Sequence, residues 1–190
     1  MFEITTERLL LRRICPEDAE DIFDIVSDEE TTLDEGGFHA FEEMDEEFRD
    51  LIRVFCRQER YGIILRSQNK LIGLLVLQRE EMLIGEAEAG FVIHRDYRRK
   101  GYMTEAMTAL LDVYFTHTGL RSVLARCFTY NTASSAMLEK IGFQYEGMEY
   151  KAFYHETRGR VDLRCYRMEK RKWKESLRPE ISFLTLKENC

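Results

Sequence analysis

Apolar residues recur every three or four positions in four parts of the chain, which is the spacing of one face of an amphipathic helix. The first such segment follows Pro16, a residue suited to the first helical position, and the second runs from about Phe41. The third follows Gly101 and carries the clearest stripe, and Gly119 is expected to end it. A shorter helix is predicted from Thr132 to Ile141.

Between these segments the pattern is that of strands. YGIILR and LIGLLVLQ, which begin at Tyr61 and Leu71, are separated by the polar turn SQNK and predict an antiparallel hairpin. Further strands are predicted at Thr6–Ile14, Glu86–His94, Arg121–Phe128, Phe143–Phe153 and Val161–Met168. This order of strands and helices predicts an α+β fold, in which helices cover the faces of a sheet.

The composition is that of one folded domain. Of the 190 residues, 44% are hydrophobic and 12% aromatic, which is enough to bury one sizeable core. Only two prolines occur, Pro16 and Pro179, and no stretch has the composition of a linker. We expect one domain over residues 1–170, followed by a C-terminal tail over residues 171–190.

Targeting and redox signals favour the cytoplasm. The chain starts without a basic segment followed by an apolar run, and its longest apolar stretch, Leu71–Leu77, is far shorter than the about 20 residues of a membrane span. The five cysteines are widely spaced and form no CxxC pair, so neither a disulfide framework nor a zinc site is predicted. We expect a soluble, cytoplasmic protein that holds no metal and does not associate with a membrane.

Negative charge is concentrated in one segment. The formal net charge is −7, but Ser27–Asp50 holds eleven acidic residues and one basic residue, whereas the rest of the chain holds 27 basic and 24 acidic residues. Such a run is either a solvated face or an acidic wall that concentrates a cationic substrate. In the second case, the entrance for the substrate is expected to be lined by Asp28, Glu29, Glu30, Asp34 and Glu35.

Three cations stand directly before the third predicted helix. Arg98, Arg99 and Lys100 precede Gly101, although the amide end of a helix already carries roughly +0.5 of an elementary charge. A strand, a tight basic loop and a helix together can hold a phosphate through backbone amides, and a glycine lets the backbone approach it. The loop matches neither GxxxxGK[ST] nor GxGxxG. It is either a pyrophosphate site or an exposed basic turn.

Two separated motifs give this loop a family context. AEAGFVIHRDYRRKGYMTEAM, followed by NTASSAMLEKIGFQYEG, resembles the GNAT superfamily of N-acetyltransferases, in particular the RimJ/RimL branch, whose members acetylate the N-termini of ribosomal proteins. TTERLLLRRICPEDAEDIF and GRVDLRCYRM are also of that type, so the resemblance covers roughly Thr5 to Lys170. It implies the GNAT fold, a mixed, mostly antiparallel sheet of six to seven strands with helices on both faces and a splayed cleft for acetyl-CoA.

The resemblance also assigns residues to the cofactor. The family's R/Q-x-x-G-x-G/A loop, which wraps the pyrophosphate of acetyl-CoA, corresponds to Arg98, Arg99, Lys100, Gly101, Tyr102 and Met103, with Thr104 next on the helix. Met103 replaces the usual Gly or Ala, so its side chain must point away from the cofactor. The preceding strand would pair its backbone with the pantetheine amides at Phe91, Val92 and Ile93. Asn131 would contact the pantetheine arm and could also cap the next helix.

In this chemistry the departing thiolate gains from a proton donor. Many GNAT enzymes use a tyrosine seven residues after the asparagine, but that position here is Leu138. The RimJ/RimL branch is proposed to use the serine three residues after the asparagine, which is Ser134 in this chain; the alternative for Ser134 is a polar residue on the helix surface. Ser135 points about 100° away on a helix and is expected to tolerate substitution.

The attacking amine must also lose a proton. By superfamily position Glu88 is the best candidate base, with a surface or salt-bridged carboxylate as the alternative. His155 and Glu156, in the loop before the last strand, could serve instead. A backbone amide near Val92 would polarise the thioester carbonyl.

The resemblance implies an enzyme that transfers an acetyl group from acetyl-CoA to a primary amine, in first place the N-terminal α-amine of a protein. The acidic segment favours a cationic peptide or protein N-terminus. The alternatives are a small cationic amine, such as a polyamine or an aminoglycoside antibiotic, and an acetyl-CoA-binding module without catalysis. The acidic total argues against nucleic-acid binding, although Lys170–Lys174 could touch RNA if it is not simply a solvated tail. A homodimer is left open.

Overall fold

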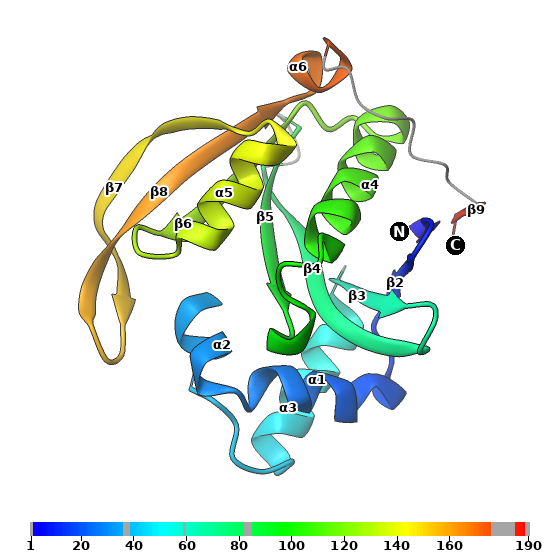
Figure 1. Ribbon diagram of the computed structural model, residues 1–190, viewed down its shortest axis with the longest axis vertical. Helices are drawn as coiled ribbons and strands as arrows, with labels where there is room; N and C mark the ends of the chain where they lie inside the picture. The colour runs from blue at the N-terminus through cyan, green and yellow to red at the C-terminus, as the bar shows by residue number, and fades with distance from the viewer. Residues whose placement is uncertain (1, 36–38, 59, 82–84, 176–184, 189–190) are drawn as a thin grey trace.

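The computed structural model describes residues 2–35, 39–58, 60–81, 85–175 and 185–188 (Figure 1). Nine strands form one mixed sheet in the order β7-β8-β6-β5-β4-β3-β2-β1-β9. They are β1 (Phe2–Thr5), β2 (Leu9–Arg13), β3 (Arg60–Leu65), β4 (Lys70–Glu81), β5 (Glu86–Ile93), β6 (Ser122–Phe128), β7 (Gln144–His155), β8 (Gly159–Glu169) and β9 (Thr185–Glu188). Every neighbouring pair is antiparallel except β5 and β6, which run parallel.

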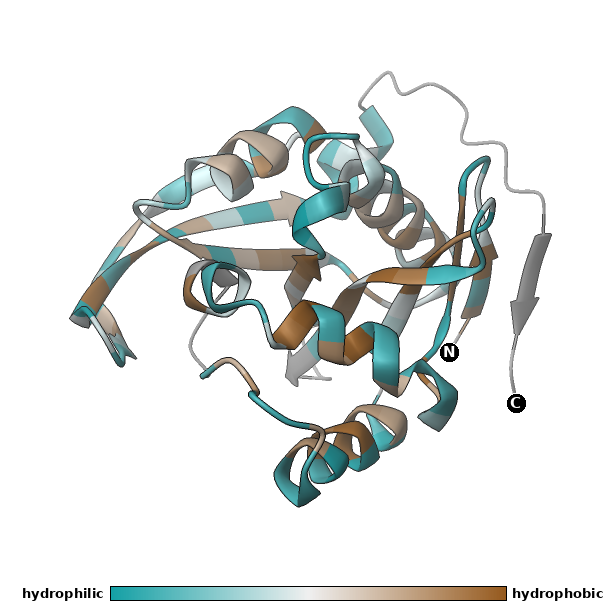
Figure 2. Ribbon diagram, turned by 60° about the horizontal axis from the view of Figure 1, so that its bottom comes forward, coloured by the Kyte–Doolittle hydropathy of each residue, from teal (hydrophilic) through white to brown (hydrophobic). Residues whose placement is uncertain are grey.

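Helical segments connect the strands and cover both faces of the sheet. They are η1 (Pro16–Asp18), α1 (Ala19–Val26), α2 (Glu29–Glu35), α3 (Glu46–Arg57), η2 (Arg95–Tyr97), α4 (Tyr102–His117), α5 (Thr132–Ile141) and α6 (Lys170–Glu175). α4 and α5 pack on one face, and α1 and α3 pack on the other (Figure 2). None of the helices within the described ranges has the length and apolar character to cross a membrane.

Residues along the central strands alternate between two cores. Ile63 and Leu75 pack in the core under α4, whereas their neighbours Ile64 and Leu74 pack against α1 and α3. Strands covered on both faces carry nearly continuous apolar sequence. This explains why LIGLLVLQ shows no alternation of apolar and polar residues.

Capping residues set the ends of the helices. Asp45 Oδ1 accepts from the N–H of Phe48 (3.0 Å) at the start of α3, and Asn131 Oδ1 accepts from the N–H of Ser134 (3.0 Å) at the start of α5. α4 ends differently from the sequence expectation. Its C-cap is Thr118 rather than Gly119, and the Thr118 hydroxyl donates to the carbonyl of Tyr114 (2.7 Å).

The parallel pair is short, and its end opens the centre of the sheet. β5 and β6 pair from Glu86 and Ser122 to Ala89 and Ala125. Beyond Ala89, β5 continues beside β4, while β6 continues beside β8. The strands diverge because each follows its own antiparallel partner. The splayed, mixed sheet with helices on both faces is therefore confirmed.

Several elements differ from the expectation. The strand predicted at Thr6–Ile14 begins only at Leu9, because the chain turns at Thr6, whose Oγ1 accepts from the N–H of Leu9 (3.0 Å), and a further strand, β1, precedes this turn. α2 forms inside the acidic segment, and α3 begins at Glu46 rather than near Phe41. With β9, which pairs with β1, the described part of the chain contributes nine strands to the sheet rather than six or seven.

The segment that begins at Lys170 is not simply a solvated tail. Trp173 in α6 is 2% exposed, and its ring centroid lies 6.1 Å from that of Phe115 in α4. The indole Nε1–H donates to Asp112 Oδ1 at 3.0 Å. The expectation of a solvated tail was wrong because it was based on the four basic residues around Trp173, whereas the one large apolar side chain among them packs on α4.

Replacing Trp173 with Ala should lower the free energy of unfolding by about 3–5 kcal/mol, because it removes a buried ring and its hydrogen bond. Urea denaturation followed by circular dichroism measures the change. Lys174→Ala, an exposed position on the same helix, is the matched control and should alter the free energy by less than about 0.5 kcal/mol. Equal stability of the two variants would show that the packing of α6 on α4 does not stabilise the fold.

Candidate active site

The basic loop before α4 contains two residues in the left-handed region. Arg99 has a φ of +61° and Gly101 has a φ of +80°. A non-glycine residue held at positive φ is strained, and such positions cluster at ligand sites. Gly101 is the N-cap of α4 and makes no side-chain capping bond, so the amides of the first turn are left for another acceptor. This geometry suits an anion.

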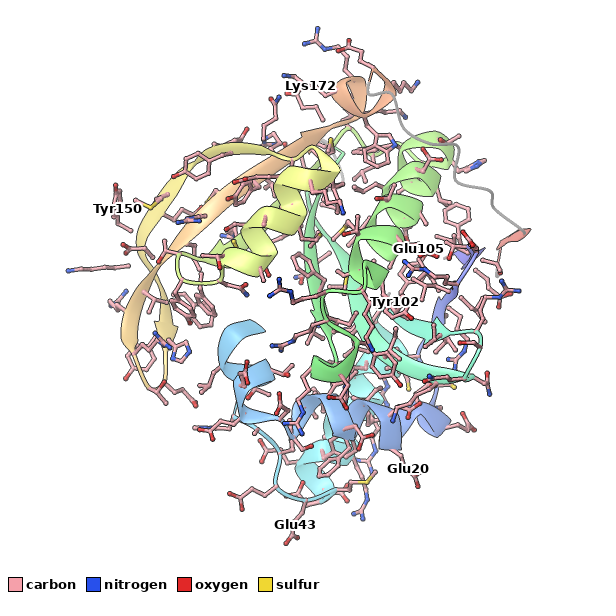
Figure 3. The ribbon with its side chains drawn as sticks, in the orientation of Figure 1. Glu20, Glu43, Tyr102, Glu105, Tyr150 and Lys172 are labelled. Carbon is pink, nitrogen blue, oxygen red and sulfur yellow. The ribbon has the colours of Figure 1, made fainter. Side chains whose placement is uncertain are left out.

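The side chains after Gly101 leave the loop open to a ligand. Met103, where the family usually has Gly or Ala, is 7% exposed and packs into the core. Its side chain therefore points away from the loop, as the sequence comparison with the family required. Figure 3 shows Tyr102 and Glu105 at the end of α4 that carries the loop.

Arg8 and Glu105 fix the loop to the start of the sheet, an arrangement that the sequence analysis missed. Glu105 accepts from the Thr6 hydroxyl (2.6 Å), the Arg8 N–H (3.1 Å) and Arg8 Nε (2.6 Å). The guanidinium of Arg8 also donates to the carbonyl of Lys100 (3.0 Å) and lies 4.5 Å from the ring centroid of Tyr102. Arg8 thus adds a fourth cation beside the loop. Nothing local in the sequence indicates a pairing across 97 residues.

The three cations of the loop point in different directions. Arg98 Nη2 donates to Thr31 Oγ1 of α2 at 2.9 Å, and its Nη1 lies 3.6 Å from the carboxylate of Glu30. Lys100 Nζ lies 5.3 Å from the ring centroid of Tyr97. Arg99 is exposed. The carboxylate of Glu30 and the ring of Tyr97 therefore offset part of the repulsion among the three cations, so this repulsion alone does not require a bound anion.

A cavity of about 340 Å³ lies between the diverging strands β5 and β6. α5 and the β7–β8 hairpin complete its walls. Four of the residues predicted from the sequence line it together: Glu88, Phe91, Asn131 and Ser134. Val92 instead contributes to the opposite face of the sheet.

The start of α5 places one hydroxyl in this cavity. Ser134 is 8% exposed, and its hydroxyl forms no hydrogen bond with another residue in the described part of the chain. Leu138 is fully buried, so no donor stands one turn further along. Ser135, expected to tolerate substitution, is 4% exposed, donates to the Asn131 carbonyl (3.3 Å) and accepts from Arg164 (3.2 Å). Tolerance at Ser135 is therefore no longer expected.

Glu88 belongs to an ion-pair network across three strands. Arg126 Nε donates to Glu88 Oε1 at 2.8 Å, and Arg126 Nη2 donates to Glu88 Oε2 at 2.5 Å. Arg126 Nη1 also donates to Glu149 of β7 at 3.3 Å. The hydrogen bonds that Arg126 donates to Glu88 raise the pKa of Arg126 above its ordinary value. Glu88 thus reaches the cavity, but as a carboxylate held by a guanidinium, which weakens it as a base.

His155 and Glu156 are engaged elsewhere. His155 is 1% exposed, and its Nδ1 accepts from the N–H groups of Thr157 and Arg158, both at 3.3 Å. The proton must then sit on Nε2, which lies 3.1 Å from the carbonyl of Leu33 in α2. Glu156 pairs with His39 at 2.6 Å. This makes His155 a support for α2, and neither residue lines the cavity that holds Ser134.

A second cavity, of about 150 Å³, lies on the other face of the sheet. Thr31 and Thr32 of α2, which are 1% and 2% exposed, form part of its wall together with Val92 of β5. Gly90 and Phe91 line both cavities. The two cavities therefore lie on either side of the same short stretch of β5.

Part of the acidic segment is neutralised by nearby cations. Asp28 accepts from the N–H (3.0 Å) and the hydroxyl (2.5 Å) of Thr31 and pairs with Arg95 at 2.9 Å. Burial opposes ionisation of Asp28, but these partners prevail and hold its pKa below the ordinary value. The side chains of Asp34 and Glu35 lie outside the described set.

Carboxylates gather instead around an open groove of about 510 Å³ beyond α2. Its acidic lining is Glu42, Glu43, Asp45, Glu47 and Glu156. Glu43 points outward from the lower edge of the molecule in Figure 3. Among the side chains that the structure describes, the acids of the segment that line this groove follow Phe41, whereas Asp28, Glu29 and Glu30 do not line it.

Comparison with known proteins agrees with this geometry. The family model for the acetyltransferase (GNAT) domain matches residues 8–144. The uncharacterized N-acetyltransferase YoaA of Bacillus subtilis is 34% identical over 157 residues, covering 78% of this chain and 86% of YoaA. The ribosomal-protein-serine acetyltransferase of Escherichia coli is 23% identical over 147 residues, which is 75% of this chain and 82% of that protein.

Solved structures agree as well. The GNAT-family acetyltransferase from Bacillus anthracis superimposes with a TM-score of 0.79 at 29% identity and covers 90% of this chain and 99% of its own. Both the family model and the relatives named N-acetyltransferases span most of the described domain. The chain therefore belongs to the GNAT family, as an acetyl-CoA-dependent N-acetyltransferase.

Proposed function

We propose that this enzyme acetylates the N-terminal α-amine of a protein, of the ribosomal-protein type. The observation that supports the proposal most is the pair of cavities on opposite faces of the sheet, which share Gly90 and Phe91. A thioester in one cavity and an amine in the other would meet there in line for attack. The similarity to a ribosomal-protein-serine acetyltransferase supports the substrate class.

Acetyl-CoA would lie along β5 with its pyrophosphate at the basic loop. The amides of Gly101, Tyr102, Met103 and Thr104 would bind the phosphates, joined by Arg99 and Lys100 and by the backbone of Arg98. The pairing of β5 with β6 ends at Ala89, so the backbone of Phe91–Ile93 on that side would pair with the pantetheine amides. Asn131 would contact the arm where it enters the cavity.

The reaction forms an N–C bond and breaks the S–C bond of the thioester. An amide of β5 near Val92 would stabilise the oxyanion of the tetrahedral intermediate. The Ser134 hydroxyl, which lines the cavity, would donate a hydrogen bond to the departing thiolate. The amine proton would pass to Glu88, directly or through water, and Arg126 would keep that carboxylate ionised and aimed.

A cationic acceptor is favoured by the groove beyond α2. Its carboxylates would attract a basic N-terminal segment whose first residue enters the second cavity. A small cationic amine such as a polyamine is the second candidate, since the same field would attract it. A non-catalytic acetyl-CoA module is the third, and release of free thiol from acetyl-CoA with a panel of amines would exclude it.

Gly101→Asp should abolish the thermal shift that acetyl-CoA produces, because it places a carboxylate where the phosphates bind. Acetyl-CoA at 100 times its dissociation constant adds about 2.7 kcal/mol to the parent's stability, or roughly 5–10 °C in melting temperature. Gly159→Asp is the matched control, since Gly159 is also at positive φ, +69°, but lies in the β7–β8 hairpin. A full shift in Gly101→Asp would place the cofactor elsewhere.

Ser134→Ala should reduce turnover by on the order of 10²-fold, while the dissociation constant of acetyl-CoA, measured by calorimetry, stays within about twofold. The reason is that the hydroxyl interacts with a thiolate that exists only as the thioester breaks. Thr132→Ala, an exposed position on the same helix, is the control and should keep parental turnover. Ser134 has no part in the mechanism if its variant turns over like the control.

Replacing Glu42, Glu43 and Glu47 together by Gln should raise the KM of a basic peptide about tenfold at low salt and leave a neutral peptide unchanged. The measurement is made at saturating acetyl-CoA, because the anionic cofactor has its own salt dependence. The difference should vanish near 1 M salt, where the Debye length is about 3 Å. A control with Gln at Glu7, Glu169 and Glu175, which are exposed and outside the groove, has the same change of net charge. If the KM values of the basic and the neutral peptide changed alike, the groove would be only a solvated face with no part in binding the acceptor.

A further inference from the structure

α2 lies across the region where the sheet divides and is held at both ends by other elements (Figure 1). At its start, Asp28 pairs with Arg95, and Thr31 accepts from Arg98. At its end, the carbonyl of Leu33 accepts from His155 (3.1 Å) and, more weakly, from the Tyr130 hydroxyl (3.5 Å). Residues from both diverging halves of the sheet therefore fix one short helix.

The contact of Arg98 is directional. Its Nη2 donates to Thr31 at 2.9 Å, its Nε lies 3.5 Å from the Ile93 carbonyl, and its Nη1 faces Glu30 at 3.6 Å. Each of the three guanidinium nitrogens thus has one partner, and the shortest contact is that with Thr31. The side chain is also more buried than that of Arg95, with 25% against 62% of its surface exposed. Arg98 thus extends from the loop toward α2 rather than over the amides of α4.

Thr31 connects this contact to the second cavity. Its hydroxyl donates to Asp28 while it accepts from Arg98, so one atom joins the helix cap to the loop. Thr31 and its neighbour Thr32 are buried and line the cavity together with Val92. A displacement of α2 at this point changes the shape of that cavity.

We propose that Arg98 is a positioning residue for the amine acceptor. Its guanidinium holds Thr31, and through it α2, against the second cavity, while the phosphates of acetyl-CoA are bound by the other groups of the loop. The link to the acceptor rests on the proposed function, because it takes the second cavity as the amine site. The contact by which Arg98 fixes α2 does not depend on the proposed function.

Hydrogen exchange of the α2 amides tests the hold without any substrate. Arg98→Gln should speed exchange of residues 31–35 about tenfold, as expected when a charge-assisted hydrogen bond is lost. Thr31→Val, which removes the acceptor and also the hydroxyl's own bond to Asp28, should do the same and guards against a general unfolding of Arg98→Gln. Arg99→Gln is the matched control in the same loop, and α2 should exchange at the parental rate in it. Parental exchange in both Arg98→Gln and Thr31→Val would overturn the proposal.

Acetyl-CoA binding separates this role from phosphate binding. By calorimetry, Arg99→Gln should weaken acetyl-CoA about tenfold, and Arg98→Gln by less than about threefold. Acetyl-CoA added to the parent should leave α2 exchange unchanged or slower. Faster exchange would mean that Arg98 leaves Thr31 for the phosphates, which would also overturn the proposal.

Kinetics then test the link to the acceptor. With a basic peptide that starts with serine, Arg98→Gln and Thr31→Val should raise the KM of the peptide about tenfold at saturating acetyl-CoA. An unchanged peptide KM in variants with faster α2 exchange would remove the acceptor role. If the parent acetylates no amine at all, the proposed function fails, whereas the exchange result still decides whether Arg98 holds α2.

Discussion

The short parallel pairing of β5 and β6 is the constraint on which the rest of the site depends. The two strands pair only to Ala89 and Ala125, and then β4 and β8 draw them apart. Main-chain groups of β5 beyond that point face a gap, and Gly90 and Phe91 can be reached from both faces of the sheet. A continuous sheet would keep a cofactor and an acceptor on opposite sides, whereas the divided one would let them meet, as the proposed function requires.

Ion pairs between segments distant in the sequence fix the elements on each side of this gap. Glu105 binds Arg8 where the basic loop meets the first strands, and Arg126 binds Glu88 and Glu149 across the diverging strands. These contacts place charged groups around the gap, yet each group has an opposite partner. The loop therefore stays formed although its own cations repel one another.

The elements that the sequence predicted are those fixed by local rules. Apolar spacing predicted the central strands and α4, and Asn131 was recognised as a residue that could cap α5. Contacts between distant residues were missed, such as that of His155 with Leu33, which are 122 residues apart. Strand parity could not tell which side Glu88 faces. The family resemblance identified Glu88, Asn131 and Ser134 as candidates. Only the fold shows that Glu88 already forms an ion pair with Arg126.

That pairing bears on which amines the enzyme can use. Glu88 is the only carboxylate among the described residues lining the first cavity, and a guanidinium binds both of its oxygens, so little basicity is available there. An α-amine, with a pKa of about 7.7–8.0, is already neutral in about a tenth of molecules at pH 7. An amine with a pKa of about 10.4 is neutral about 10²–10³ times less often. At a site with a weak base, the second amine would react more slowly by about this factor, which corresponds to roughly 3–4 kcal/mol. Selection of N-termini would then follow from the low pKa of the α-amine as much as from the shape of the cavity.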